Sequence, residues 1–224
     1  LSERVAKSIA KPEKEYERYV GLFFDAINNM YFIPGGRTLR NSGKFKQGLL
    51  NCGCLPINDN IESIGETIKN ALIMWKYGAG IGINFSNIRT KGTPLISMGG
   101  EASGVLSFLD LFEVGANVIE TGGQRRSGAL ILLSVDHPSI FEFINAKRID
   151  GKYQRFNFSV GVTEDFINAV REDKDWDLTF SGQTVRTIKA IEIWDSLLES
   201  MIDNAEPGII NITNLKKNNS FYFH

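Results

Sequence analysis

Leu49-Leu50-Asn51-Cys52-Gly53-Cys54-Leu55-Pro56-Ile57 is the stretch around which the rest of the chain is organised. It is mostly apolar and is bounded by a proline, which predicts a short buried strand. It also contains the only two cysteines among the 224 residues. A thiol can donate a proton and, with a partner thiol, two electrons. We therefore expect redox chemistry here, with Cys52 as the candidate thiol.

The spacing of the two cysteines allows an alternative, a local Cys-x-Cys redox pair. Residues two apart on a strand point to the same face, but a disulfide between them would distort the extended backbone. We therefore favour a more distant partner for Cys52. Cys54 is then expected to be a small hydrophobic residue buried in the core.

Composition limits the class of protein. With 42% hydrophobic residues, 224 residues can bury a sizeable core. Lys and Arg (25) nearly balance Asp and Glu (26), so no overall field attracts nucleic acid or a membrane surface. Two cysteines are too few for a disulfide framework, and His137 and His224 lack zinc-ligand spacing to them, so no metal site is expected. No apolar run approaches the roughly 20 residues that a bilayer requires, and we expect a cytoplasmic protein.

Helical and strand patterns alternate along the chain, which predicts the α/β class. Apolar residues at helical spacing predict helices over 13–30, 61–77, about 109–119, about 138–147, 163–171 and 188–202. Apolar or alternating runs predict strands over 49–57, 129–135, 156–162 and 178–180. Asn58-Asp59-Asn60 and Thr163 are expected to cap the helices that follow them, and the turn at 136–138 to cap another. The lone His137 is expected to be structural.

Glycine-rich segments separate these elements. Gly78–Phe85 is not a dinucleotide fingerprint, because a helix precedes its glycines and a β-like run follows them. The long stretches 86–104 and 120–129 are typical of functional loops. The second lacks the Gly-Lys-Ser/Thr ending of a P-loop but carries Arg125 and Arg126, which favours ligand contact.

Pro34-Gly35-Gly36-Arg37-Thr38 interrupts the helical pattern before it. Proline removes a donor and two glycines permit unusual backbone angles, so a tight turn with exposed amides is predicted. Amides and guanidinium groups both match phosphate oxygens, and Arg37, Thr38 and Arg40 flank this turn. A phosphate seat is one interpretation, and a plain turn is the other.

Six segments, in their order and spacing, resemble the large subunit of ribonucleotide reductase. Within that family they are most similar to the adenosylcobalamin-dependent class II enzymes. The resemblance runs from about residue 15 to the end. The segments are Pro34–Leu39, Leu50–Cys52, Tyr77–Ser86, Gly99–Gly104, Gly122–Arg126 and Val135–Pro138.

This resemblance implies a fold: a ten-stranded α/β barrel of two five-stranded halves. Residues 1–30 would be a helical lead-in, and 31–224 the first half of the barrel. It also implies a reaction, in which a cysteine thiyl radical abstracts the 3′ hydrogen of a ribonucleotide and the 2′ hydroxyl leaves as water. Two cysteines supply the electrons as they become a disulfide, and Cys52 matches the first of them. The implied cofactor is adenosylcobalamin.

The resemblance further assigns substrate-binding positions. Asn51, Cys52 and Gly80 match residues that touch the ribonucleotide. Gly36 falls where some relatives place a hydroxyl residue on the substrate phosphate. Because that hydroxyl is absent, backbone amides or Thr38 would have to replace it.

Two loops resemble the site for a deoxynucleoside triphosphate (dNTP) effector. Asp59 matches an acid that contacts the effector, and Arg89 an arginine near its phosphates. The second specificity loop of the family is matched by Gln124, Arg125 and Arg126. In the family, the sequence of this loop is close to Gly-Gly-Arg-Arg-Arg-Gly, and Gln124 and Ser127 depart from it. The resemblance therefore does not imply which substrate base this loop would select.

The family's Asn-Pro-Cys-Gly-Glu segment with the radical cysteine is not among these residues. We therefore expect an inactive fragment that requires the remainder of the reductase chain, a thioredoxin-like reductant and, by family likeness, a second copy in a homodimer. Two alternatives remain open: the large subunit of the iron-dependent class I enzymes, and a non-catalytic nucleotide-binding module.

Overall fold

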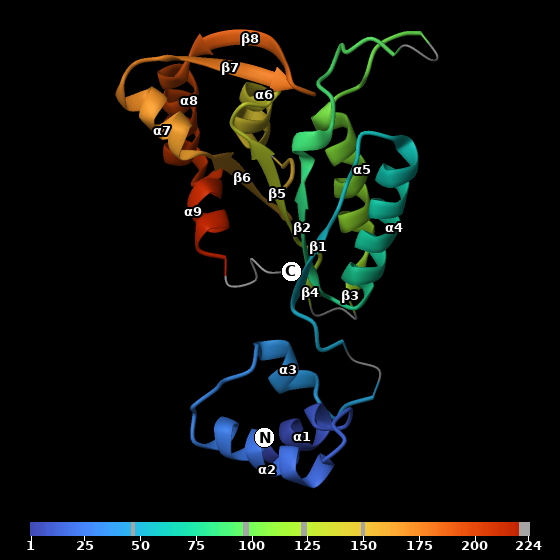
Figure 1. Cartoon of the computed structure of the whole chain (residues 1–224). Coiled ribbons are helices and arrows are strands. Elements are labelled where there is room, and N and C mark those ends of the chain that lie inside the picture. The colour runs from blue at the N-terminus through green and yellow to red at the C-terminus, as the bar shows by residue number, and fades with distance from the viewer. Residues whose placement is uncertain (46–47, 96–98, 122–124, 149–150, 220–224) are drawn as a thin grey trace.

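The computed structural model describes residues 1–45, 48–95, 99–121, 125–148 and 151–219, with backbone alone for 120, 121, 125 and 126. A five-stranded parallel sheet forms its centre (Figure 1). The strands, in spatial order, are β1 (Cys52–Leu55), β2 (Gly80–Asn84), β5 (Ala129–Ser134), β6 (Phe156–Val162) and β9 (Gly208–Asn211).

Helices connect successive strands. They are α4 (Ile61–Lys76), α5 (Val105–Val118), α6 (Ile140–Asn145), α7 (Glu164–Arg171) and α8 (Ala190–Asn204), with short 3₁₀ turns η1 (Phe85–Asn87) and η2 (Ala146–Arg148). Neighbouring strands follow each other in the chain, and right-handed crossovers then place the connecting helices on one face of the sheet. This is the arrangement of half of an α/β barrel, as the sequence predicts.

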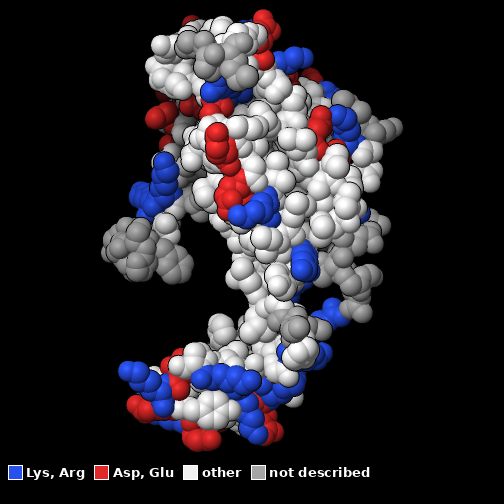
Figure 2. Space-filling view, turned by 90° about the vertical axis from the view of Figure 1, so that its right-hand side faces the viewer, with Lys and Arg blue, Asp and Glu red and all other residues white. Residues whose placement is uncertain are grey.

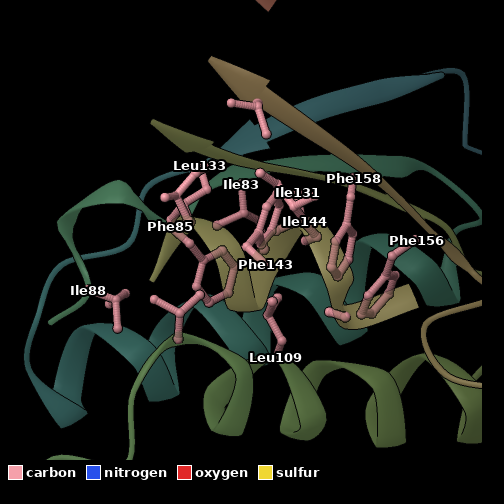
Figure 3. Close-up of a cluster of buried hydrophobic side chains, with 14 of the residues drawn as sticks. Ile83, Phe85, Ile88, Leu109, Ile131, Leu133, Phe143, Ile144, Phe156 and Phe158 are labelled. Atoms are coloured by element: carbon pink, nitrogen blue, oxygen red, sulfur yellow. The ribbon is translucent and has the colours of Figure 1, made fainter. Parts of the chain in front are cut away.

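The hydrophobic core lies between the sheet and these helices. Figure 3 shows Ile83, Ile131, Leu133 and Phe158 on the strands, with Leu109 of α5 facing them from the helical layer. Each of these side chains is at most 4% exposed. The face of the sheet that is turned toward these helices is therefore filled by core side chains.

The opposite face of the sheet is open over β1, β2 and β5. Alternation along β5 leaves Leu130 exposed while its neighbours Ala129 and Ile131 are buried. Over β6, the last helix α9 (Ile212–Lys217) covers this face, and a Cβ on Gly161 would lie 3.1 Å from Ile212. We call the uncovered side of β1, β2 and β5 the open face.

Three helices precede the sheet: α1 (Ser2–Ile9), α2 (Tyr16–Asn28) and α3 (Gly36–Asn41). They lie together below it in Figure 1. The guanidinium of Arg4 in α1 donates to the carbonyls of Ser42 and Leu39, which ties α1 to α3. The division of the chain at residue 30 stays a prediction.

Two antiparallel hairpins extend from opposite ends of the sheet. β3 (Glu120–Thr121) and β4 (Arg125–Arg126) lie at the end where the parallel strands begin. β7 (Asp175–Phe180) and β8 (Gln183–Lys189) lie at the other end (Figure 1). Within the described ranges, no helix is long and apolar enough to cross a membrane.

Several local predictions are confirmed. The helix predicted over 61–77 is α4, and the Asn60 side chain accepts a hydrogen bond from the Ser63 amide at 2.7 Å. Thr163 caps α7 in the same way, through the Phe166 amide at 3.2 Å. Short polar side chains at these positions satisfy amides that a helix cannot bond internally.

Other predictions are wrong in informative ways. Residues 49–57 do not form a buried strand: β1 covers only Cys52–Leu55 and is an edge of the sheet. The turn at 136–138 does not cap α6, whose N-cap is Ser139 and makes no side-chain capping bond. The strand predicted over 178–180 is longer and pairs with β8, which has mainly exposed side chains and therefore no apolar pattern to reveal it.

Candidate functional site

The amino end of β1 brings the Cys52 thiol onto the open face beside β2. Cys52 and Gly80 are register partners, and the Gly80 amide donates to the Asn51 carbonyl at 2.8 Å. A Cβ on Gly80 would lie 3.1 Å from the Cys52 Sγ. The absence of a side chain at residue 80 therefore leaves room for the thiol.

The segment before α3 lies against the same point. A Cβ on Gly35 would lie 2.1 Å from Nδ2 of Asn51, so only glycine permits this approach. The Thr38 hydroxyl donates to the Leu49 carbonyl at 3.4 Å. The structure thus gathers the five predicted substrate residues around the start of β1: Gly36, Thr38, Asn51, Cys52 and Gly80.

The predicted tight turn at 34–38 is instead the start of α3. Gly35 has φ −54° and Gly36 is helical, so neither adopts the left-handed angles that glycine favours. Arg37 is used in packing: its Nη1 donates to the Tyr77 carbonyl at 2.7 Å, and its guanidinium lies over Gly78. The Arg37 guanidinium therefore joins α3 to the α4–β2 loop, and the phosphate-seat interpretation stays a prediction.

A hollow of about 240 Å³ opens beside Cys52. We call it the amino-end hollow. Its polar lining comes from the Cys52 thiol and from Arg155 and Asn157 of the β6 region, while residues 78–81 and 128–130 supply glycine and apolar surface. It offers a thiol, a cation and an amide within one concave site on the open face.

Cys54 is not a buried core residue. Both cysteines are free and exposed, because alternation along β1 places them on the open face and not toward the helices. A Cβ on Gly82 would lie 3.7 Å from the Cys54 Sγ, an ordinary contact distance. Cys54 therefore lies one row further along β1 and outside the lining of the amino-end hollow.

Asp59 and Arg89, the first two predicted effector residues, are bound to each other. The Arg89 Nε donates to Asp59 Oδ2 at 2.6 Å, and the Arg89 amide donates to Oδ1 at 3.2 Å. Both side chains are partly buried, with 24% of the Asp59 side chain exposed and 32% of the Arg89 side chain. They lie where β1 and β2 have ended, at the carboxyl end of the sheet.

The remaining predicted effector residues lie at the other end. The β3–β4 hairpin, which includes Arg125 and Arg126, directly precedes β5 at the amino end of the sheet (Figure 1). Gln124 lies outside the described residues. Since β5 has six residues at about 3.3 Å each, roughly 20 Å of sheet separates the two groups. One chain therefore does not bring them into a single small-molecule site.

A second hollow, of about 910 Å³, lies at the carboxyl end between residues 89–95 and the tip of the β7–β8 hairpin. Arg89 and Lys91 give this carboxyl-end hollow a basic side, and Phe180, Gln183 and Thr184 of the hairpin face it. The sequence did not indicate the hairpin's part in it, because β8 has no motif and no apolar period.

In the part of the chain that the structure describes, no group of three or more His, Cys, Asp and Glu side chains is placed to hold a metal ion. The groups that line the amino-end hollow are a thiol, an amide and an arginine.

The half-barrel, with an exposed thiol on its open face, defines the class of protein, an α/β barrel. Comparison with known proteins makes this specific: residues 50–223 match the family model described as the ribonucleotide reductase barrel domain. The chain belongs to the ribonucleotide reductase large-subunit family.

Two vitamin B12-dependent ribonucleoside-diphosphate reductases are similar over most of this chain. The protein from Thermoplasma acidophilum is 37% identical over 204 residues, which are 90% of this chain and 27% of that protein. The protein from Mycobacterium tuberculosis is 34% identical in an alignment 227 residues long, which covers 98% of this chain and 33% of that protein. The large chain of the reductase from Encephalitozoon cuniculi is 27% identical in an alignment 233 residues long, which covers 91% of this chain and 30% of that protein. The chain thus spans about a third of these relatives.

Proposed function

We propose that this chain is the first half of the catalytic barrel of a ribonucleotide reductase that converts ribonucleotides to 2′-deoxyribonucleotides. The observation that carries the proposal is the Cys52 thiol, which lies on the open face over Gly80 and lines the amino-end hollow. In a closed barrel the open face is the interior. A substrate bound in the amino-end hollow would contact this thiol.

The reaction requires two electrons and two protons. A cysteine from the remainder of the polypeptide would pair with Cys52; the 2′ C–O bond breaks, water leaves, and the two thiols become a disulfide. A thioredoxin-like dithiol would then reduce that disulfide. Asn51, held against Gly35, supplies an amide beside the thiol, and Gly80 lets the substrate approach the backbone. Gly36 and Thr38 would contribute to the phosphate end.

Adenosylcobalamin, when bound, would supply the radical that starts this chemistry. The names of two relatives support a cobalamin cofactor. Both relatives are more similar to this chain than the reductase large chain from Encephalitozoon cuniculi, whose name mentions no vitamin B12. We propose that the remainder of the polypeptide contributes to cofactor binding.

A dNTP effector is proposed to bind at Asp59 and Arg89 of one chain and at the β3–β4 hairpin of a second. The separation of these groups along the sheet supports a site that two chains build together. Exposed apolar residues on α4 and α5 support a homodimer through these helices: Ile61, Ile73, Leu111, Val114 and Val118. Figure 2 shows this side of the sheet domain as mostly uncharged surface with a few acidic and basic side chains, whereas the helices α1 and α2 are densely charged.

The test is formation of 2′-deoxyribonucleotide by the complete polypeptide that contains this chain, supplied with adenosylcobalamin and a dithiol. Cys52→Ser should abolish multiple turnover, and Cys54→Ser, its matched control two residues away on the same face, should not. Loss of turnover in the Cys54 variant alone would overturn the assignment. Activity that needs a radical-donating second subunit and not cobalamin would favour class I.

A further inference from the structure

The turn at 136–139 makes contacts on both sides of Arg89. His137 is only 2% exposed, and its Nε2 lies 2.8 Å from the Ile88 carbonyl. Ser139 is equally buried, and its hydroxyl lies 2.7 Å from that of Thr90. One turn, about 50 residues away in the sequence, therefore holds the residues immediately before and after Arg89.

The hydrogen bonds fix the chemical form of His137. The Ser139 amide donates to Nδ1 at 3.0 Å, so Nδ1 carries no proton. A neutral ring then has its proton on Nε2 and donates it to the Ile88 carbonyl. Every polar atom of the ring has a partner from the protein, which leaves none for catalysis.

The turn is itself held by the β7–β8 hairpin. The Thr179 amide donates to the Asp136 carbonyl at 2.7 Å, and the Phe180 ring meets His137 edge-to-face with centroids 5.8 Å apart. The same Phe180 lines the carboxyl-end hollow opposite Arg89. The hairpin, the turn and the arginine loop thus form one continuous set of contacts.

We propose that His137 and Ser139 are positioning residues for the nucleotide effector: they hold the backbone of Ile88 and Thr90 so that Arg89 stays aligned with Asp59. This rests on the proposed effector site at Asp59 and Arg89. The turn acts through Arg89, and neither His137 nor Ser139 touches the ligand.

The Arg89 amide offers a readout that needs no nucleotide. It donates to Asp59 Oδ1, so its hydrogen exchange reports how well Arg89 is held. Ser139→Ala and Thr90→Val each remove one side of the hydroxyl contact. Each should raise the exchange rate of this amide roughly three- to tenfold, the range for one lost hydrogen bond. Ser200→Ala is the matched control, because Ser200 is also buried and its hydroxyl donates to the Ile144 carbonyl, on α6.

Binding is measured on the same variants by calorimetric titration of dTTP and dGTP. Ser139→Ala and Thr90→Val should each weaken binding by a similar factor, and the double variant should be no worse than either, because one contact is lost in all three. His137→Phe keeps the edge-to-face packing but loses both ring bonds and should have a larger effect on both readouts. If that variant does not fold, Ser139→Ala and Thr90→Val still test the positioning role.

Unchanged exchange at Arg89 in Ser139→Ala and Thr90→Val would overturn the positioning role, as would equal acceleration in Ser200→Ala. Weakened nucleotide binding without faster exchange would overturn it too, since the effect would not pass through Arg89. If the parent chain binds neither nucleotide, the proposed effector site fails, and the exchange rates alone decide whether the turn positions Arg89.

Discussion

The carboxylate of Asp59 binds both the backbone and the side chain of Arg89, through the amide at 3.2 Å and Nε at 2.6 Å. This pair joins the end of β1 to the segment after β2. It is charge-assisted and partly shielded from water, which separates it from ion pairs on the open surface.

Asp59→Asn should lower the free energy of unfolding by about 1.5–3 kcal/mol, the range for hydrogen bonds to a charged group. Urea denaturation of the chain measures it. Glu66→Gln breaks the Glu66–Lys69 pair, whose side chains are 58% and 60% exposed, and should leave the free energy of unfolding almost unchanged, because solvent screens this pair. Equal losses for the two variants would contradict the distinction.

Gly80→Ala should displace the Cys52 thiol, because the new Cβ would lie 3.1 Å from its Sγ. We expect the rate of Cys52 alkylation by iodoacetamide to change roughly two- to tenfold, which corresponds to the free energy of an off-rotamer side chain. Gly82→Ala is the control for Cys54, since there the contact is 3.7 Å and requires no shift. Peptide mass spectrometry separates the two cysteines. An unchanged Cys52 rate would show that Gly80 does not constrain the thiol.

The sequence could predict elements whose signals are local. The capping side chain of Asn60 and the apolar period of α4 follow from neighbours in the chain, and both are confirmed. Exposure of Cys54 could not be predicted, because the open face is apolar and glycine-rich although no helix in the described part of the chain covers it over β1. An apolar strand is therefore predicted to be buried whether the residues that would cover it belong to this chain or not.

Long-range contacts were beyond the sequence for a different reason. Gly35 was noted as part of a turn, whereas its role comes from Asn51, which lies 16 positions later in the sequence. Pairing of Asp59 with Arg89 is a similar case: family resemblance selected both residues, but only the fold shows that they bind each other. Spatial neighbours without a periodic pattern leave no trace in a single sequence.

Gly35→Ala should separate substrate binding from folding. The added Cβ would lie 2.1 Å from Nδ2 of Asn51, the end of a flexible side chain, so the amide moves while the backbone angles at 35 still suit alanine. In the complete polypeptide we expect a higher KM for the ribonucleotide, with the midpoint of thermal unfolding nearly unchanged.

Gly21→Ala is the control for that experiment. No atom lies within 4 Å of its added Cβ and the residue lies inside α2, so stability should rise by up to about 1 kcal/mol. An equally raised KM in Gly21→Ala would show that the effect does not pass through Asn51.

Stability should fall as the pH drops below about 6.5, because burial lowers the pKa of His137. The Ile88 carbonyl and the carboxylates of Asp136 and Asp59 oppose this shift, and burial outweighs them. Below 6.5 the unfolded ring binds a proton that the folded ring does not, so protons favour unfolding until the folded pKa is passed. Above 6.5 both states are neutral and the contribution is constant.

Urea denaturation between pH 7.5 and 5 measures this dependence. His137→Phe removes the titrating ring and should flatten the decline in that window. The same slope in the variant and the parent would assign the pH dependence to other groups.

Val114→Glu should dissociate the proposed homodimer. Val114 is 63% exposed on α5, beside the exposed Leu111 and Val118, so the described residues leave this stripe uncovered. A carboxylate buried without a partner in an interface costs about 3–5 kcal/mol, which raises the dimer Kd by more than a hundredfold. Sedimentation velocity at micromolar concentration would show a dimer for the parent and a monomer for the variant. Ile202→Glu is the matched control, since Ile202 is 84% exposed on α8, away from α5. Because the effector site is proposed to need two chains, Val114→Glu should also weaken dTTP binding, and full binding by a monomeric variant would place the whole site within one chain.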